Sequence, residues 1–170
     1  MATKTARRTE QDLLGVYLND HLAGATVGVG LVRRMAASAE PGSKTAAVVK
    51  PLVSEITADR SALVTMMAAA GVKVRGYKVL AAWAGEKAGR LKLNGHLLSR
   101  SPLSALEETE MLRLGVEGKA AGWRTLQVVA QRDPRLDAGQ LDELLARAIR
   151  QSDTLEGLRV SIAEQVLGDR

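Results

Sequence analysis

The chain has 170 residues, a formal net charge of +5 and no cysteine. This length fits one domain with a substantial core, and the missing cysteines exclude disulfides, thiolate metal sites and cysteine nucleophiles. Phenylalanine is absent and aromatic residues make up 2%, so the core has to be built from Leu, Val, Ile, Met and Ala. The polar N-terminus and the short apolar runs predict a cytoplasmic protein with no secretory signal and no membrane contact.

The first predicted helix covers residues 9–38. Apolar and small residues recur there at intervals of four and three, which is the repeat of a helix packed along its length in a bundle. The stripe consists of Leu14, Leu18, His21, Ala25, Gly28, Val32 and Met35. Thr9 is a suitable N-cap, so residues 1–8 are expected to be a disordered basic tail. Gly24 and Gly28 lie four residues apart, a spacing that permits close approach of a neighbouring helix.

The second predicted helix covers residues 43–70, after a turn at 39–43. Gly71 is its expected terminator, because glycine adopts the left-handed conformation that ends many helices. Pro51 lies inside this span, so the helix is either kinked there or begins there. The predicted core stripe consists of Val49, Leu52, Ile56, Asp59, Leu63, Met66 and Ala70.

Residues 71–100 form a long connection that contains seven basic residues and one acidic residue, Glu86. A short amphipathic helix is predicted at 77–93. The candidate residues for binding a polyanion are Lys73, Arg75, Lys78, Lys87, Arg90 and Lys92. Such a run either is a solvated face or binds an acidic partner or a nucleic-acid backbone.

Two further helices are predicted at 101–131 and 137–167, the second with Asp137 as N-cap. One stripe of the helix at 101–131 consists of Leu103, Leu106, Glu110, Leu114, Glu117, Ala121 and Val128, and an adjoining face carries Leu112, Val116, Trp123 and Leu126. The core face of the last helix consists of Leu141, Leu144, Leu145, Ala148, Leu155, Leu158, Ile162 and Val166. Short connections at 39–43 and 132–136 predict two antiparallel hairpins, and the long connection lets the second and third long helices run parallel.

Three polar residues in these stripes fall at a similar height in the predicted bundle: His21, Asp59 and Glu117. Glu117 should also face residues 151–153 of the last helix. Buried charges are unfavourable unless they are paired, so we expect these side chains to contact one another or a ligand. Three interpretations remain open: a hydrogen-bonded network that fixes the helix register, a site for a single Fe, Mn or Zn ion, or residues that simply face solvent.

The helix lengths, the single long crossover and the carboxylate–histidine layer resemble the ferritin-like superfamily over roughly residues 9–168. The segments YLNDHLAGAT, ADRSAL, GRLKLNG and MLRLGVEGKAAGW are also similar to uncharacterised actinobacterial proteins of this kind. The resemblance implies a ferritin-like, up-down-down-up four-helix bundle with an extra helix in the crossover. The chain lacks the Glu-x-x-His motifs that hold a di-iron centre in this superfamily.

The leading functional hypothesis is therefore a non-enzymatic protein without a di-iron site that acts in structure or interaction, with another protein or a second copy of the chain as partner. One alternative is a divergent metal-binding or oxidative-stress protein of the ferritin-like type. The other is an accessory nucleic-acid-binding protein that uses the basic crossover.

Overall fold

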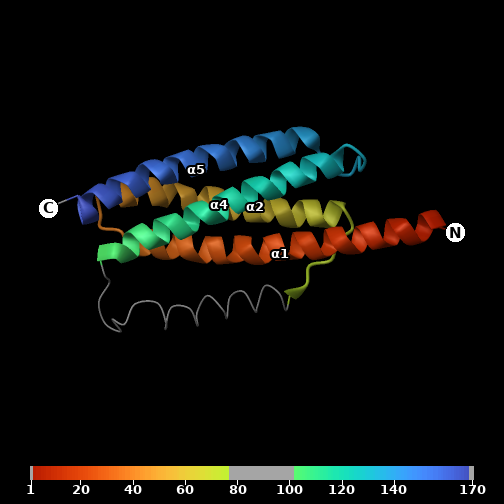
Figure 1. Ribbon diagram of the computed structural model, residues 1–170, viewed down its shortest axis with the longest axis horizontal. Coiled ribbons are helices and arrows are strands. Elements are labelled where there is room, and N and C mark those ends of the chain that lie inside the picture. The colour runs from red at the N-terminus through yellow and green to blue at the C-terminus, as the bar shows by residue number, and fades with distance from the viewer. Residues whose placement is uncertain (1, 77–101, 169–170) are drawn as a thin grey trace.

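The computed structural model describes residues 2–76 and 102–168, with side chains from residue 11 in the first segment and from residue 103 in the second. These segments form four helices and no strand (Figure 1). The helices are α1 (Ala2–Ser38), α2 (Lys44–Ala69), α4 (Pro102–Ala130) and α5 (Ala138–Leu167). The prediction of an all-α protein is confirmed for the described residues. The short helix predicted at 77–93 lies outside them.

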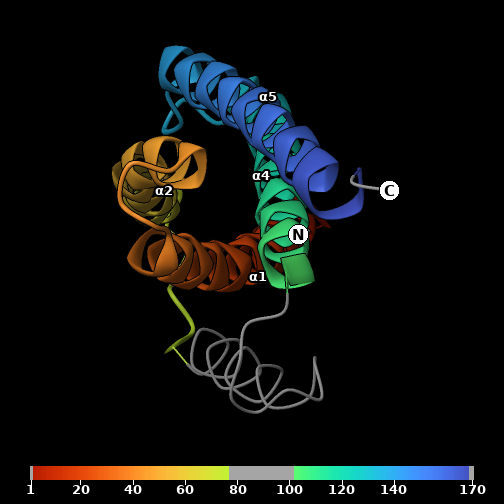
Figure 2. The same ribbon diagram turned by 90° about the vertical axis from the view of Figure 1, so that its left-hand side faces the viewer.

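The helices form two antiparallel hairpins that pack side by side. In Figure 1, α2 and α4 run in the same direction, opposite to α1 and α5. Packing is most extensive within the hairpins α1–α2 and α4–α5, and the hairpins meet along two seams, α1 against α4 and α2 against α5. Seen along the bundle, the four helices surround a common core (Figure 2). None of the described helices has the length and apolar character needed to cross a membrane.

The ends of α2 agree with the sequence prediction. Ser43 is the N-cap, and its side chain accepts a hydrogen bond from the backbone N–H three residues later at 3.1 Å. Gly71 has a φ of +72°, and the N–H of Val72 donates to the carbonyl of Met67 at 2.8 Å. This is the Schellman arrangement, in which a glycine lets the chain satisfy the last carbonyls of a helix. Pro51 lies inside α2, so the helix does not begin there.

The N-terminal boundary of α1 differs from the prediction, because the helix starts at Ala2 and not at Thr9. Residues 2–8, predicted as a disordered tail, are helical in the structure. The beginning of α5 agrees with the prediction: Asp137 is the N-cap and accepts a hydrogen bond from the N–H of Gln140 at 3.1 Å.

The core is formed by the predicted stripes of α2 and α5 but by the other face of α4. All seven stripe residues predicted for α2 are buried. On α4, Leu114 is 65% exposed and Val128 61% exposed, and Leu106 is the only buried member of the predicted stripe. The adjoining face supplies the core residues Leu112, Val116, Ala120, Trp123 and Leu126. Both faces of α4 carry apolar residues at helical spacing, so periodicity alone does not tell which face meets the neighbouring helices.

The α4–α5 hairpin also contains an ion pair on its surface, where Glu110 of α4 lies 3.8 Å from Arg159 of α5. Both side chains are partly exposed, so we expect this pair to contribute little to stability.

Asn19 of α1 fixes the segment that leaves α2. This side chain is fully buried, accepts a hydrogen bond from the N–H of Arg75 at 2.6 Å and donates to the carbonyl of Lys73 at 3.0 Å. It also donates to the carbonyl of Gly15 at 2.7 Å. The amide therefore ties residues 73–75 to the side of α1, a role that no sequence pattern indicated.

Candidate functional site

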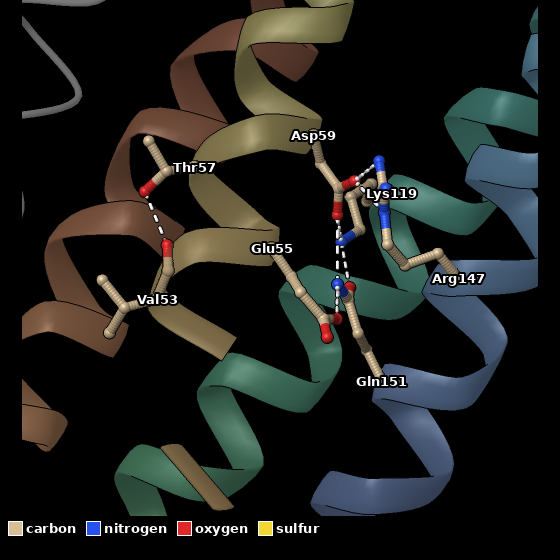
Figure 3. Close-up of polar contacts among 7 residues, drawn as sticks. All are labelled: Val53, Glu55, Thr57, Asp59, Lys119, Arg147 and Gln151. Atoms are coloured by element: carbon tan, nitrogen blue, oxygen red, sulfur yellow. Dashed lines mark hydrogen bonds and ion pairs between the residues drawn. The ribbon is translucent and has the colours of Figure 1, made fainter. Parts of the chain in front are cut away.

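A buried ionic cluster joins α2 to α4 and α5 (Figure 3). Its centre is Asp59, whose side chain is 1% exposed. Oδ2 of Asp59 accepts from Nζ of Lys119 at 2.5 Å, and Oδ1 accepts from Nε of Arg147 at 2.7 Å. The amide of Gln151 accepts from Lys119 and donates to Asp59 at 3.2 Å. It also donates to Glu55 at 2.9 Å. We call these five residues the Asp59 cluster.

The charges of the Asp59 cluster balance, because two acids face two bases. Lys119 is 14% exposed, and burial lowers the pKa of its ammonium group, while the charge of Asp59 opposes this shift. A buried carboxylate is tolerated when its charge is compensated and its lone pairs accept hydrogen bonds, as they do here. The cluster therefore holds the two hairpins in one arrangement along the α2/α5 seam.

No sequence pattern pointed to Lys119 or Arg147 as cluster residues. The sequence of α5 nevertheless contains one sign of the cluster. Gln151 lies three residues after Ala148 and four before Leu155, so it falls on the same buried face of the helix. A polar residue at such a position needs partners from a facing helix. Which partners these are depends on the packing of three helices, and the sequence does not specify that packing.

The structure does not bring His21, Asp59 and Glu117 together as one layer. Asp59 is buried, but its partners are the cations and the amide of the cluster. Glu117 lies on the exposed face of α4 and accepts a hydrogen bond from Ser152 at 2.5 Å. The prediction that Glu117 faces residues 151–153 is confirmed, whereas its predicted place in the core is wrong. The cause is the choice of the wrong apolar face of α4.

A metal ion at this layer stays a prediction. Among the described residues, no three side chains of His, Asp or Glu gather as a group that could hold a metal ion. Both carboxylate oxygens of Asp59 already accept hydrogen bonds from cationic side chains. The geometry therefore gives no specific support to a single Fe, Mn or Zn ion bound by His21, Asp59 and Glu117.

The α1/α4 seam is fixed at both of its ends by polar contacts. The hydroxyl of Tyr17 donates to Oγ1 of Thr125 at 3.0 Å. At the other end, Nε of Arg34 lies 3.1 Å from Oε1 of Glu108. Since the helices are antiparallel, these two contacts set which residues of α1 and α4 face each other between them.

Between these contacts the seam opens into a cavity of about 600 Å³, formed by α1, α4 and α2. Most of the lining side chains are apolar, and five of the lining residues are glycines: Gly24, Gly28, Gly115, Gly118 and Gly122. At the first four of these glycines, an added Cβ would meet no atom within 4 Å. We call this space the seam cavity. Its volume is in the usual range of small-molecule sites, roughly 300–1,000 Å³.

The glycines of α1 therefore have a different effect from the predicted one. Gly24 and Gly28 were expected to bring a neighbouring helix close, but both border open space. Gly122 is the exception among the lining glycines, because an added Cβ there would lie 3.0 Å from Nδ1 of His21. The imidazole of His21 thus packs on the glycine backbone of α4.

Three ring-bearing side chains line one end of the seam cavity: Tyr17, His21 and Trp123. The rings of Tyr17 and His21 are in contact, with centroids 4.4 Å apart. Burial lowers the pKa of the His21 imidazole, and the neighbouring charge of Asp20 opposes the shift. Trp123 is 2% exposed, and its indole N–H has no acceptor among the described residues. The inner wall of the cavity includes Asp59 and Lys119 of the Asp59 cluster.

Of the six residues predicted to bind a polyanion, the structure describes two, Lys73 and Arg75. Both line a second, more polar pocket beside the N-terminal part of α1. Lys73 is exposed and Arg75 is half-buried. The other candidates, Lys78, Lys87, Arg90 and Lys92, lie outside the described residues. Polyanion binding therefore stays a prediction.

Comparison with known proteins finds no matching family model, no matching curated protein and no matching solved structure. What the protein does is therefore inferred from the seam cavity and the Asp59 cluster themselves.

Proposed function

We propose that the protein is a non-enzymatic binding protein that holds a small apolar molecule in the seam cavity. The observation that supports this proposal is the lining: apolar side chains and glycines surround about 600 Å³ between two helices whose ends are pinned by polar contacts. A mostly apolar cavity with a few polar groups is the usual form of a small-molecule site.

The glycines give the strongest reason to treat the cavity as a site. Glycine inside a helix is about 0.8–1 kcal/mol less favourable than alanine. Gly24, Gly28, Gly115 and Gly118 lie inside helices, and no close contact explains their lack of a side chain. Gly24, Gly115 and Gly118 are exposed, so alanine there would favour the helices without a clash, and glycine leaves the mouth of the seam cavity unobstructed.

Several of the polar groups around the cavity already have partners, which favours binding over chemistry. The ammonium group of Lys119 is held by Asp59 and Gln151. The hydroxyl of Tyr17 is bonded to Thr125. A ligand in this cavity would meet these groups as parts of the wall, since each is already held in place by a hydrogen bond to the protein.

The ferritin-like resemblance remains part of the proposal at the level of the fold. Two antiparallel hairpins with α2 and α4 parallel are the arrangement expected from that resemblance. We propose that the protein is a ferritin-like bundle without a di-iron site, in which the space between α1 and α4 serves binding.

Binding is tested with the neutral, apolar fluorescent dye N-phenyl-1-naphthylamine, whose emission rises in apolar surroundings. We expect saturable binding to the full-length protein near one equivalent. Replacing Gly118 or Gly24 by leucine should abolish the signal, because the new side chain occupies the seam cavity. Gly157 is the matched control: it is exposed on α5, and an added Cβ there meets no atom within 4 Å.

Circular dichroism of the variants shows whether the bundle remains folded. Equal loss of binding in Gly157→Leu and Gly118→Leu would indicate a general effect of leucine and contradict the proposed site. Failure of the unaltered protein to bind the dye, or full binding by both folded cavity variants, would also contradict it.

A further inference from the structure

The seam cavity is long, because its lining follows α1 and α4 over several turns. On α1 the lining begins at Tyr17 and ends at Leu31, and on α4 it begins at Met111 and ends at Leu126. The two helices run antiparallel, and Tyr17 is bonded to Thr125 beside Leu126, so these walls lie opposite each other (Figure 1). A sphere of 600 Å³ would be about 10 Å across, roughly half of the 21 Å that the α1 wall covers at 1.5 Å per residue. The space is therefore elongated along the bundle.

The two ends of the seam cavity differ in polarity. Leu31 and Met111 line one end, and neither side chain offers a strong hydrogen-bonding group. Tyr17, Asp20 and His21 line the other end and bring a hydroxyl, a carboxylate and an imidazole to it. A molecule with one polar end and an apolar remainder matches this distribution.

Between its ends, the cavity offers a ligand few groups for hydrogen bonds. Lys119 is bonded to Asp59, and Nε of Arg60 donates to Thr26 at 3.0 Å. The indole nitrogen of Trp123 is fully buried in the protein, so it is not available to a ligand. Methylene groups need no hydrogen-bond partner, and their transfer from water to apolar surroundings is favourable. The middle of the cavity therefore suits a hydrocarbon.

Resting on the proposed function, we infer that the ligand is an amphiphile with a single unbranched hydrocarbon chain. Its polar end group lies beside Asp20 and His21, and its chain extends between α1 and α4 toward Leu31 and Met111.

The experiment compares two straight-chain alcohols, 1-octanol and 1-tetradecanol, as competitors that displace N-phenyl-1-naphthylamine from the full-length protein. At about 1.25 Å per carbon, the extended molecules are about 10 Å and 17 Å long, so both fit the unaltered cavity. Each buried methylene increases affinity by up to about fourfold. We expect 1-tetradecanol to bind at least about a hundredfold more tightly, with both alcohols kept below their solubility limits.

The decisive variant is Gly28→Leu, which shortens the cavity from the Leu31 end. Gly28 lines the cavity, and an added Cβ there meets no atom within 4 Å. It lies about 16 Å from Tyr17 along α1, and helical side chains lean toward the N-terminus, so less than this length remains open. We expect the affinity for 1-tetradecanol to fall at least about tenfold, and that for 1-octanol to change by less than about twofold.

A second variant and a control make the result specific. Gly115→Leu acts from the facing wall, because Gly115 lies ten residues before Thr125 and an added Cβ there also meets no atom within 4 Å. It should reproduce the selective loss of 1-tetradecanol binding if Gly28→Leu does not fold. Gly157→Leu, on the exposed surface of α5, should change neither affinity. Circular dichroism establishes that each variant is folded.

The outcomes separate the two levels of the proposal. If neither the dye nor an alcohol binds, the proposed function itself is wrong. If the dye binds but 1-tetradecanol displaces it no better than 1-octanol does, the cavity binds apolar molecules and the chain inference is wrong. Equal losses for both alcohols in the folded variants, or no loss for 1-tetradecanol, would also overturn the inference, because the chain would then not extend past these glycines.

Discussion

Replacing Asp59 by asparagine tests whether the Asp59 cluster locks the two hairpins together. Asparagine keeps the shape of the side chain but removes the charge that compensates Lys119 and Arg147. Lys119 is 14% exposed and has little access to water, whereas Arg147, at 31%, regains part of its hydration. Loss of one partner from a buried pair destabilises by about 3–5 kcal/mol, and the exposure of Arg147 places our expectation near 3 kcal/mol. For a domain of this size, that corresponds to a melting temperature roughly 6–12 °C lower.

The free energy of unfolding is measured by urea denaturation followed by circular dichroism. Asp153→Asn is the matched control, because Asp153 is an exposed acid on α5, the helix that carries Arg147 and Gln151, and its loss should change stability by no more than about 0.5 kcal/mol. Lys119→Met provides a second comparison. It leaves Asp59 bonded to Arg147, so it should be less destabilising than Asp59→Asn. Equal stabilities of Asp59→Asn and Asp153→Asn would refute the assignment of the cluster as a lock.

Three further predictions concern the seam cavity and the layer. Alanine at Gly24 or Gly118 should stabilise the protein by up to about 1 kcal/mol, whereas alanine at Gly122 should destabilise it, because the new Cβ lies 3.0 Å from His21; urea midpoints measure both effects. Because burial lowers the pKa of His21, the unfolded chain, which titrates near 6.5, takes up this proton at higher pH than the folded protein. Stability should therefore decrease as the pH is lowered below about 6.5, and a decrease just as large in His21→Gln would contradict the assignment. Protein purified without a chelator should contain far less than one equivalent of Fe, Mn or Zn by elemental analysis; near-stoichiometric metal that is lost in Glu117→Gln would favour the metal-binding alternative.

The fold was largely predictable because helix boundaries and core faces leave local marks in the sequence. Ser43, Gly71 and Asp137 end or begin helices as predicted, since capping depends on residues within one turn. All seven residues of the predicted α2 stripe are buried, although Ala46 and Met67, which the prediction left out, are buried as well. Helix α4 has two apolar faces, and the choice between them is made by contacts with α1 and α5 that lie far away in the sequence.

The candidate site was less predictable for the same reason. Asp59 was recognised as a buried acid, since it interrupts an apolar stripe, but its partners Lys119 and Arg147 come from two other helices. The wrong face of α4 moved Glu117 into the predicted core, whereas Lys119, two residues further along, is the residue that reaches it. Because the wrong face of α4 was assigned to the core, the prediction placed Glu117 beside Asp59. In the structure, Lys119 of α4 forms an ion pair with Asp59 instead.

The seam cavity could not be predicted from the glycines, because a glycine in a helix has opposite consequences in different surroundings. Where a neighbouring side chain packs against it, a glycine makes room for that side chain, as Gly122 does for the ring of His21. Where polar contacts at the ends hold the helices at a fixed separation, it leaves space, as at Gly24 and Gly118. The two seams of the bundle therefore differ in kind. Charged side chains join the hairpins where α2 faces α4 and α5, whereas polar contacts on either side of the seam cavity join α1 to α4.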